Sequence, residues 1–90
     1  MNPIYDALPP DEVIEVEKLA RLMYELRGAR DDLLARLGAA NADQALACIR
    51  AGDLPEHPSY ENYLSVRILT DLGSQARSDL AARLEAQQKR

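Results

Sequence analysis

The sequence predicts an all-α protein in which a long, a short and a second long helix form an antiparallel helical hairpin, and two hairpins pair into a dimeric four-helix bundle. Its 90 residues suffice for one domain. Hydrophobic residues make up 47% of the chain, most of them are Leu or Ala, and Phe and Trp are absent, a composition that favours helix over sheet. Two long segments also place apolar residues every three or four positions, which is the period of an amphipathic helix.

The first helix is predicted over residues 11–37, after an extended lead-in at 1–10 in which three prolines disfavour helix. Pro10 suits a helix start, and the acidic residues that follow it complement the positive end of the helix dipole. Gly38 is the expected C-cap, because glycine readily adopts the left-handed conformation that ends many helices. A single helical domain is expected over 11–90.

An apolar seam runs along this helix at spacings of three and four residues. It comprises Val16, Leu19, Met23, Leu26, Leu33 and Leu37. Arg30 occupies a seam position and Arg27 falls beside it, and a charge on an apolar face is costly unless it is paired. One expectation is a buried interhelical ion pair with Asp71, Asp79 or an acid of a second subunit. The other is an anion or dicarboxylate site, because the arginine fork matches carboxylate geometry.

A short helix is predicted over 41–51 and a second long helix over 58–87. Asn41 followed by Gln44 fits a capping box at the start of the short helix. Pro58 suits the first position of the last helix. The apolar stripe of the last helix is expected to consist of Leu64, Ile68, Leu69, Leu72, Ala76, Leu80 and Leu84.

The connector and the start of the last helix concentrate residues suited to contacting a partner. By helical periodicity Tyr60 flanks Leu64 and could belong to the core, whereas Tyr63 points more outward. Tyrosine combines a large apolar ring with a hydroxyl that stays hydrated, which suits interfaces. The candidate partner-binding patch is His57, Tyr60, Asn62 and Tyr63. The alternative is that both rings only cover the hairpin end and the short helix.

No metal or cofactor site is expected. A metal site generally needs three or four closely spaced ligands, whereas Cys48 and His57 are nine residues apart. Asp53, Glu56 and Glu61 lie near His57 in the sequence, so a weak oxygen-rich site is the alternative. Nucleophilic catalysis by a Cys–His pair requires hydrogen-bond contact and an activating environment, and the spacing establishes neither.

Cysteine content and hydropathy predict a cytoplasmic protein. One cysteine cannot form an internal disulfide, which suits a reducing compartment. The first residues lack the basic start and apolar stretch of a signal peptide. No apolar run approaches the roughly 20 residues of a membrane-spanning helix. We therefore expect no membrane partner.

The charge balance disfavours nucleic-acid binding. The formal net charge is −4, whereas phosphate backbones require clustered Lys and Arg. Only two of the 11 basic residues are Lys, and the arginines are interleaved with acids. Residues 6–17 carry five carboxylates and no base. This run predicts either a solvated helix start or a docking surface for a basic partner.

The apolar surface predicts self-association. At 100° per residue the first helix is apolar over about half of its circumference, which is more than one partner helix covers. The surplus indicates a second chain, and a homodimer forming a four-helix bundle is the simplest closure. We therefore expect a small cytosolic protein–protein interaction module that serves as an adaptor, accessory subunit or regulator of a larger complex, with no catalysis of its own. Its partners would be itself and an unidentified protein.

Two other function classes remain as alternatives. The long-short-long plan is similar in architecture to that of small all-helical chorismate mutases, which also dimerise and bind a dicarboxylate through arginines. The resemblance implies an enzyme that uses Arg27 and Arg30. The chain departs from that family because the family's pocket also uses a lysine shortly after the first helix, and residues 38–58 contain none. A DNA-binding regulator is the third class, but the connector GDLPEHP is longer than the usual turn of a helix-turn-helix.

Overall fold

The computed structural model describes residues 8–88 of the chain and contains three helices. They are α2 (Pro10–Leu37), α3 (Ala42–Arg50) and α4 (Glu56–Gln88). Within residues 8–88 there is no strand, which confirms the all-helical prediction, and no helix is both long and apolar enough to cross a membrane. Most of the predicted extended lead-in, residues 1–7, lies outside the described part.

Local sequence features account for both ends of α2. Pro10 is its first residue, where the missing N–H is not needed, and two acidic residues follow in the first turn. Gly38 ends the helix with a φ of 65°, in the left-handed region that glycine adopts readily. The Gly38 N–H donates to the carbonyl of Ala35 at 3.2 Å, and the Ala39 N–H donates to that of Leu34 at 3.1 Å. These two hydrogen bonds give donors to backbone carbonyls in the last turn of α2.

A variant of the predicted capping box begins α3. The Asn41 side-chain oxygen accepts from the Gln44 N–H at 2.8 Å, as expected. The Gln44 side chain accepts in return from the N–H of Ala40, one residue earlier than in a standard capping box. After α3, Gly52 has a φ of 82° and turns the chain so that Leu54 packs against the core.

The helical run of α4 begins at Glu56, but His57 has extended angles of φ −117° and ψ 132°. Because the residue before a proline avoids the helical region, continuous helix starts at Pro58.

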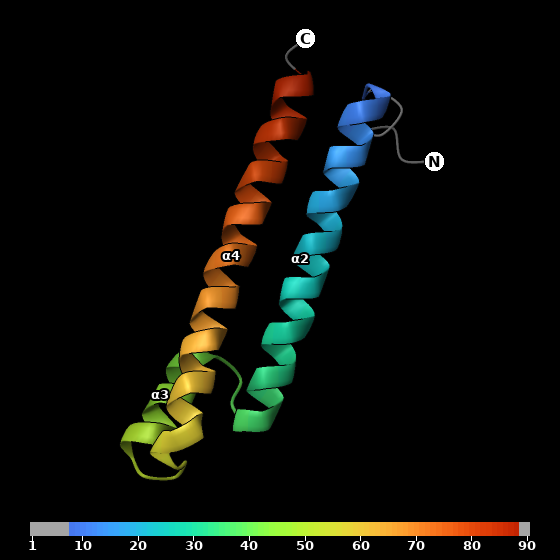
Figure 1. The fold of residues 1–90 in the computed structure, drawn as a ribbon. Helices are drawn as coiled ribbons and strands as arrows, with labels where there is room; N and C mark the ends of the chain where they lie inside the picture. The colour runs from blue at the N-terminus through green and yellow to red at the C-terminus, as the bar shows by residue number, and fades with distance from the viewer. Residues whose placement is uncertain (1–7, 89–90) are drawn as a thin grey trace.

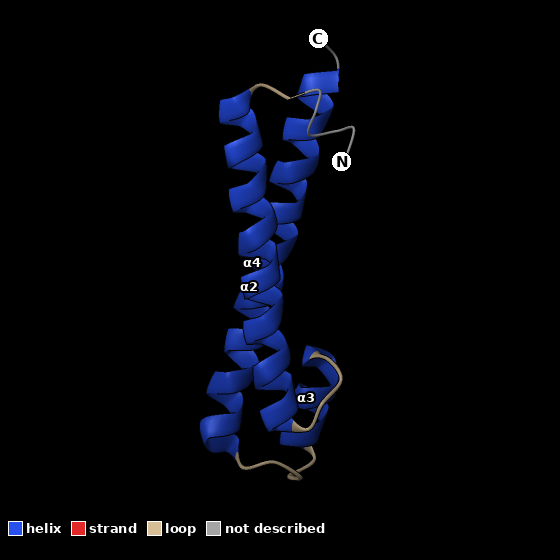
Figure 2. Cartoon of the chain, turned by 90° about the vertical axis from the view of Figure 1, so that its right-hand side faces the viewer, coloured by secondary structure: helices blue, strands red, loops and turns tan. Residues whose placement is uncertain are grey.

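The two long helices lie side by side and antiparallel, with α3 beside the first turns of α4 (Figures 1 and 2). The molecule measures 54 × 20 × 17 Å, and its Cα radius of gyration is 17.4 Å. A compact globule of this length would have a radius of gyration of about 12 Å. The chain is therefore a rod with a large surface relative to its volume.

The main core lies at the end of the hairpin where the three helices meet. Its buried members are Leu34, Leu37, Ala45, Tyr63 and Val66. Farther along the hairpin, Val16 of α2 and Ala76 of α4 are also buried, and so is Leu8 in the segment that precedes α2. Every predicted seam residue of α2 is buried or half-buried, which confirms the seam.

The predicted stripe of α4 is only partly correct. Its members Leu69, Ala76, Leu80 and Leu84 are buried or half-buried. The others are exposed, with relative accessibilities of 40%, 59% and 49% for Leu64, Ile68 and Leu72. The difference arises because α4 packs against both α2 and α3, and the face that meets them includes Tyr63 and Val66. With Tyr63 and Val66 facing inward, the helical period turns the side chains of Leu64, Ile68 and Leu72 toward solvent.

Candidate functional site

A pocket of about 490 Å³ lies between α3 and the start of α4. Its apolar lining comes from two aliphatic residues of α3 and two tyrosines of α4, and charged residues border it. The lining consists of Leu46, Ile49, Arg50, Glu56, Tyr60, Tyr63 and Arg67. Two arginines against one glutamate give this pocket a positive border, which we call the junction pocket.

The two tyrosines of the junction pocket have different environments. Tyr63 is buried, with 4% of its surface exposed, whereas Tyr60 is 41% exposed. Their ring centroids are 5.8 Å apart. The Tyr63 hydroxyl accepts a hydrogen bond from Nη1 of Arg67 at 3.1 Å, which raises the pKa of the guanidinium. The predicted orientation was therefore wrong, because α3 covers the Tyr63 side of α4.

The other two residues of the predicted patch do not line the junction pocket. Nδ1 of His57 lies 2.6 Å from Oε1 of Glu61, and both side chains are exposed. A hydrogen bond from the backbone N–H of Glu61 lowers the pKa of its carboxyl, and the contact with His57 lowers it further. Asn62 is half-buried. The structure thus brings together Tyr60 and Tyr63 but leaves His57 and Asn62 outside the pocket.

The arginines that interrupt the α2 seam do not pair with Asp71 or Asp79. Nε and Nη2 of Arg30 donate to one Asp31 oxygen at 3.1 and 3.0 Å, so the next residue in the chain supplies its carboxylate. Arg30 is half-buried and Arg27 is exposed, so neither forms a buried ion pair within the single chain.

The interhelical ion pair that the described residues do contain was not predicted. Nη1 of Arg83 donates to Oε1 of Glu12 at 3.1 Å and joins the open end of the hairpin. The two residues are 71 positions apart. Only the antiparallel register of α2 and α4 brings them together.

A groove of about 270 Å³ lies between the middle parts of α2 and α4. We call it the arginine groove, because three arginines line it and no carboxylate does. Its lining consists of Met23, Leu26, Arg27, Arg30, Leu69, Thr70, Gly73, Ser74 and Arg77. Sequence reasoning missed Arg77 and Ser74, since both lie on the polar side of α4. An antiparallel pairing that places Arg27 near Gly73 would have identified them.

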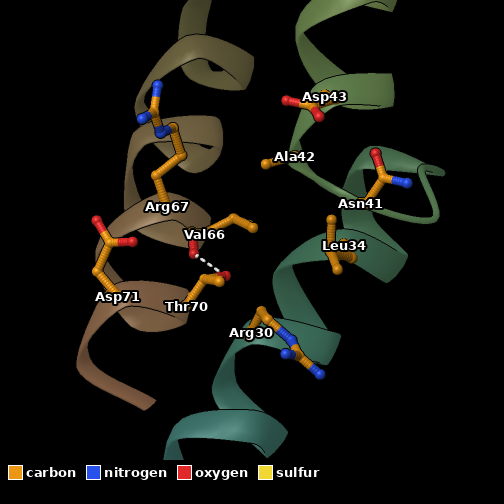
Figure 3. A pocket seen from close by; sticks show the side chains of 9 residues that line it. All are labelled: Arg30, Leu34, Asn41, Ala42, Asp43, Val66, Arg67, Thr70 and Asp71. Carbon is orange, nitrogen blue, oxygen red and sulfur yellow. Dashed lines mark hydrogen bonds between the residues drawn. The ribbon is translucent and has the colours of Figure 1, made fainter. Parts of the chain in front are cut away.

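A neighbouring hollow of about 320 Å³ lies where α2, α3 and α4 meet (Figure 3). It shares Arg30 and Thr70 with the arginine groove. Figure 3 shows Arg67 and Asp71 on α4, across the hollow from Arg30 on α2. Asp43 also lines it, so two arginines and two aspartates give it a balanced charge. The Thr70 hydroxyl donates to the Val66 carbonyl at 2.8 Å.

The residues considered as metal ligands do not form a cluster. Cys48 is half-buried in α3, and its thiol is free. Among residues 8–88, no group of three or more His, Cys, Asp or Glu side chains is arranged to hold a metal ion. Of the three acids near it in the sequence, Asp53, Glu56 and Glu61, His57 contacts Glu61.

No family model, no curated protein and no solved structure matches this chain. Its function is therefore inferred from the surfaces and grooves of the described residues.

Proposed function

We propose that this chain is a small helical protein–protein interaction module that self-associates and serves a larger complex as an adaptor, accessory subunit or regulator, with no catalysis of its own. The observation that supports it is the apolar stripe that Leu64, Ile68 and Leu72 leave exposed on α4. These residues follow one another at four-residue spacing, so they form a continuous ridge on one face of the helix. We place the protein in the cytosol, because a chain with one cysteine suits a reducing compartment.

The exposed area supports a second chain. The surface of the molecule is 6444 Å². A compact monomer of the same mass would expose about 5,200 Å², so the excess is roughly 1,200 Å². A stable interface buries about 800 Å² on each partner. An interface of that size with one further copy would cover about two-thirds of the excess.

A second copy is the occupant that this stripe fits best. In a two-fold interface each chain presents the same patch, so an apolar ridge meets an identical ridge. Two hairpins joined in this way form a four-helix bundle. The stripe lies on the face of α4 that is turned away from the core, so pairing requires no rearrangement of the hairpin.

Light scattering on the purified chain tests this pairing. We expect twice the chain mass for the wild type and the single-chain mass for Ile68→Glu, because a glutamate at the centre of the ridge would be buried without a partner. The matched control is Ala47→Glu, which adds the same charge on an exposed position of α3. A wild type with the mass of one chain, or an Ile68→Glu variant that stays a dimer, contradicts the proposed interface.

The junction pocket is the proposed contact for the second protein. Tyr60, Leu46 and Ile49 offer an apolar surface, and Arg50 and Arg67 border it with positive charge. The pocket therefore fits a partner segment that carries an apolar or aromatic side chain next to an acidic one. Because Tyr60 is half exposed and Tyr63 is already buried, Tyr60 would supply most of the new contact area.

Affinity capture from the native extract, with the bound proteins quantified by mass spectrometry, tests the junction pocket. We expect a partner recovered in stoichiometric amount by the wild type and at least ten-fold less by Tyr60→Ala, as for an interface residue worth more than about 1.4 kcal/mol. Tyr24→Ala is the control, since Tyr24 is an exposed tyrosine on α2. Equal recovery by all three proteins would place the contact elsewhere.

A further inference from the structure

Polar residues continue the exposed apolar stripe of α4 beyond both of its ends. At about 100° per residue, Glu61, Gln75 and Asp79 all point within about 20° of the direction of Ile68. All three are exposed. A second copy that packs lengthwise along the stripe contacts these residues as well, so their charges decide which way its α4 can run.

A parallel pair of α4 helices brings like charges together. In a two-fold dimer with parallel helices, each residue on the contact line faces the same residue of the other chain. Glu61 would then face the partner's Glu61, and Asp79 would face the partner's Asp79. Carboxylates placed opposite one another oppose association, so the parallel orientation is disfavoured.

An antiparallel pair centred on Ile68 replaces both of these contacts with favourable ones. Each residue before Ile68 then lies opposite the residue that follows Ile68 by the same number of positions in the other chain. Glu61 therefore lies opposite the partner's Gln75, whose amide can donate to the carboxylate. Asp79 lies opposite the first residues of the partner's α4, where the positive end of the helix dipole favours an acid.

One edge of the stripe carries a base and an acid one helical turn apart. Arg67 and Asp71 lie about 100° and 60° from Ile68 on the same side of α4, and both are exposed (Figure 3). Nη1 of Arg67 donates to the Tyr63 hydroxyl, and Asp71 forms no ion pair among residues 8–88. In the antiparallel pair these edges meet, and Arg67 lies within about 3 Å, along the helix axis, of the level of the partner's Asp71.

We propose that two copies of this chain pair their α4 helices antiparallel about Ile68. Arg67 of each chain binds Asp71 of its partner at the edge of the interface. Leu64 packs against the partner's Leu72 at its centre. This inference rests on the proposed self-association and adds the orientation of the two chains. It also adds specificity, because the complementary charges favour a second copy over an unrelated apolar helix.

The pairing also changes the junction pocket, because Arg67 lines it. The partner's Asp71 neutralises part of the positive border of this pocket. Arg50 then remains to meet the acidic side chain of the second protein.

Disulfide cross-linking tests the orientation, in chains whose native cysteine is removed by Cys48→Ala. Leu64→Cys and Leu72→Cys chains should cross-link when they are mixed and oxidised. Neither should do so alone, because two copies of the same cysteine lie about 12 Å apart along the helix axis, too far for a disulfide. Ile68→Cys is the matched control, because it lies at the centre and should cross-link with itself in either orientation.

The outcomes separate the orientation from the self-association itself. If Ile68→Cys cross-links but the mixed chains do not, or if Leu64→Cys cross-links alone, the antiparallel orientation is wrong. If Ile68→Cys forms no cross-link, the self-association stripe is wrong and this inference fails with it.

Charge reversal tests the ion pair, with the dissociation constant of the dimer measured by analytical ultracentrifugation. Arg67→Glu and Asp71→Arg should each weaken the homodimer about ten-fold, because two attractive pairs become two repulsive ones. An equimolar mixture of the two variants should form a heterodimer within about three-fold of the wild-type affinity, since both interchain pairs are then attractive. Mixing cannot restore an ion pair within one chain, so this recovery is specific to the interface.

Arg77→Glu is the matched control, because Arg77 is an exposed arginine of α4 that lines the groove toward α2. It should change the affinity less than two-fold. Circular dichroism of each variant verifies that its helices are retained. Equal weakening by Arg77→Glu, or a mixture that associates no more tightly than either variant alone, overturns the ion pair.

Discussion

Glu61 lies near the start of α4, where its carboxylate and His57 make a contact that depends on pH. The backbone N–H of Glu61 and the His57 ring both lower the pKa of this carboxyl below its ordinary value of 4.5. Since the pKa is lower in the folded state than in the unfolded state, the carboxylate contributes stability above about pH 4.5. This contribution is lost as the pH falls through the folded-state pKa. The effect should be small, because the group is exposed.

Thermal unfolding of the wild type and Glu61→Gln across this pH range measures that contribution. We expect the wild type to have the higher melting temperature at neutral pH and the difference to shrink as the pH falls well below 4.5. His57→Gln should retain part of the pH dependence, because the backbone hydrogen bond remains. A difference between wild type and Glu61→Gln that is constant with pH would exclude this linkage.

At the scale of single helices, the sequence predicts where a helix begins and ends better than it predicts which side of the helix is buried. Pro10, Gly38 and Asn41 act through atoms within a few residues of themselves, so the pattern around each one predicts where a helix begins or ends. Which side of α4 faces inward depends instead on where α3 packs. That packing is not local, and this is why Tyr63 is buried while Leu64 is exposed.

The lining of the arginine groove shows the same contrast between features that are local to one helix and features that depend on how two helices pack. Arg27 and Arg30 were found because they interrupt an apolar seam, which is visible within one helix. Arg77 and Ser74 belong to the groove only through the register of α4 against α2. The carboxylate that pairs with Arg30 was also misassigned, because Asp31 is its immediate neighbour and competes successfully with any acid across the hairpin.

At the scale of the whole molecule, the rod shape explains why the hairpin has more apolar residues than it buries. A rod 54 Å long and at most 20 Å wide has its core concentrated at one end, and much of the apolar surface of α4 faces solvent. A second hairpin alongside would widen the rod and cover the stripe of Leu64, Ile68 and Leu72. The fold and the assembly would then depend on each other.

This coupling predicts that stability depends on protein concentration. If folding and pairing are linked, a hundred-fold rise in concentration adds about 2.7 kcal/mol to the free energy of unfolding of the dimer. For a dimer of two 90-residue chains that corresponds to a rise of roughly 5–11 °C in melting temperature. Circular dichroism melts of the wild type at two concentrations measure it, and Ile68→Glu should show no such dependence. A wild-type melting temperature that is the same at both concentrations would indicate that the hairpin is stable as a monomer, and the exposed stripe would then be free for a different partner.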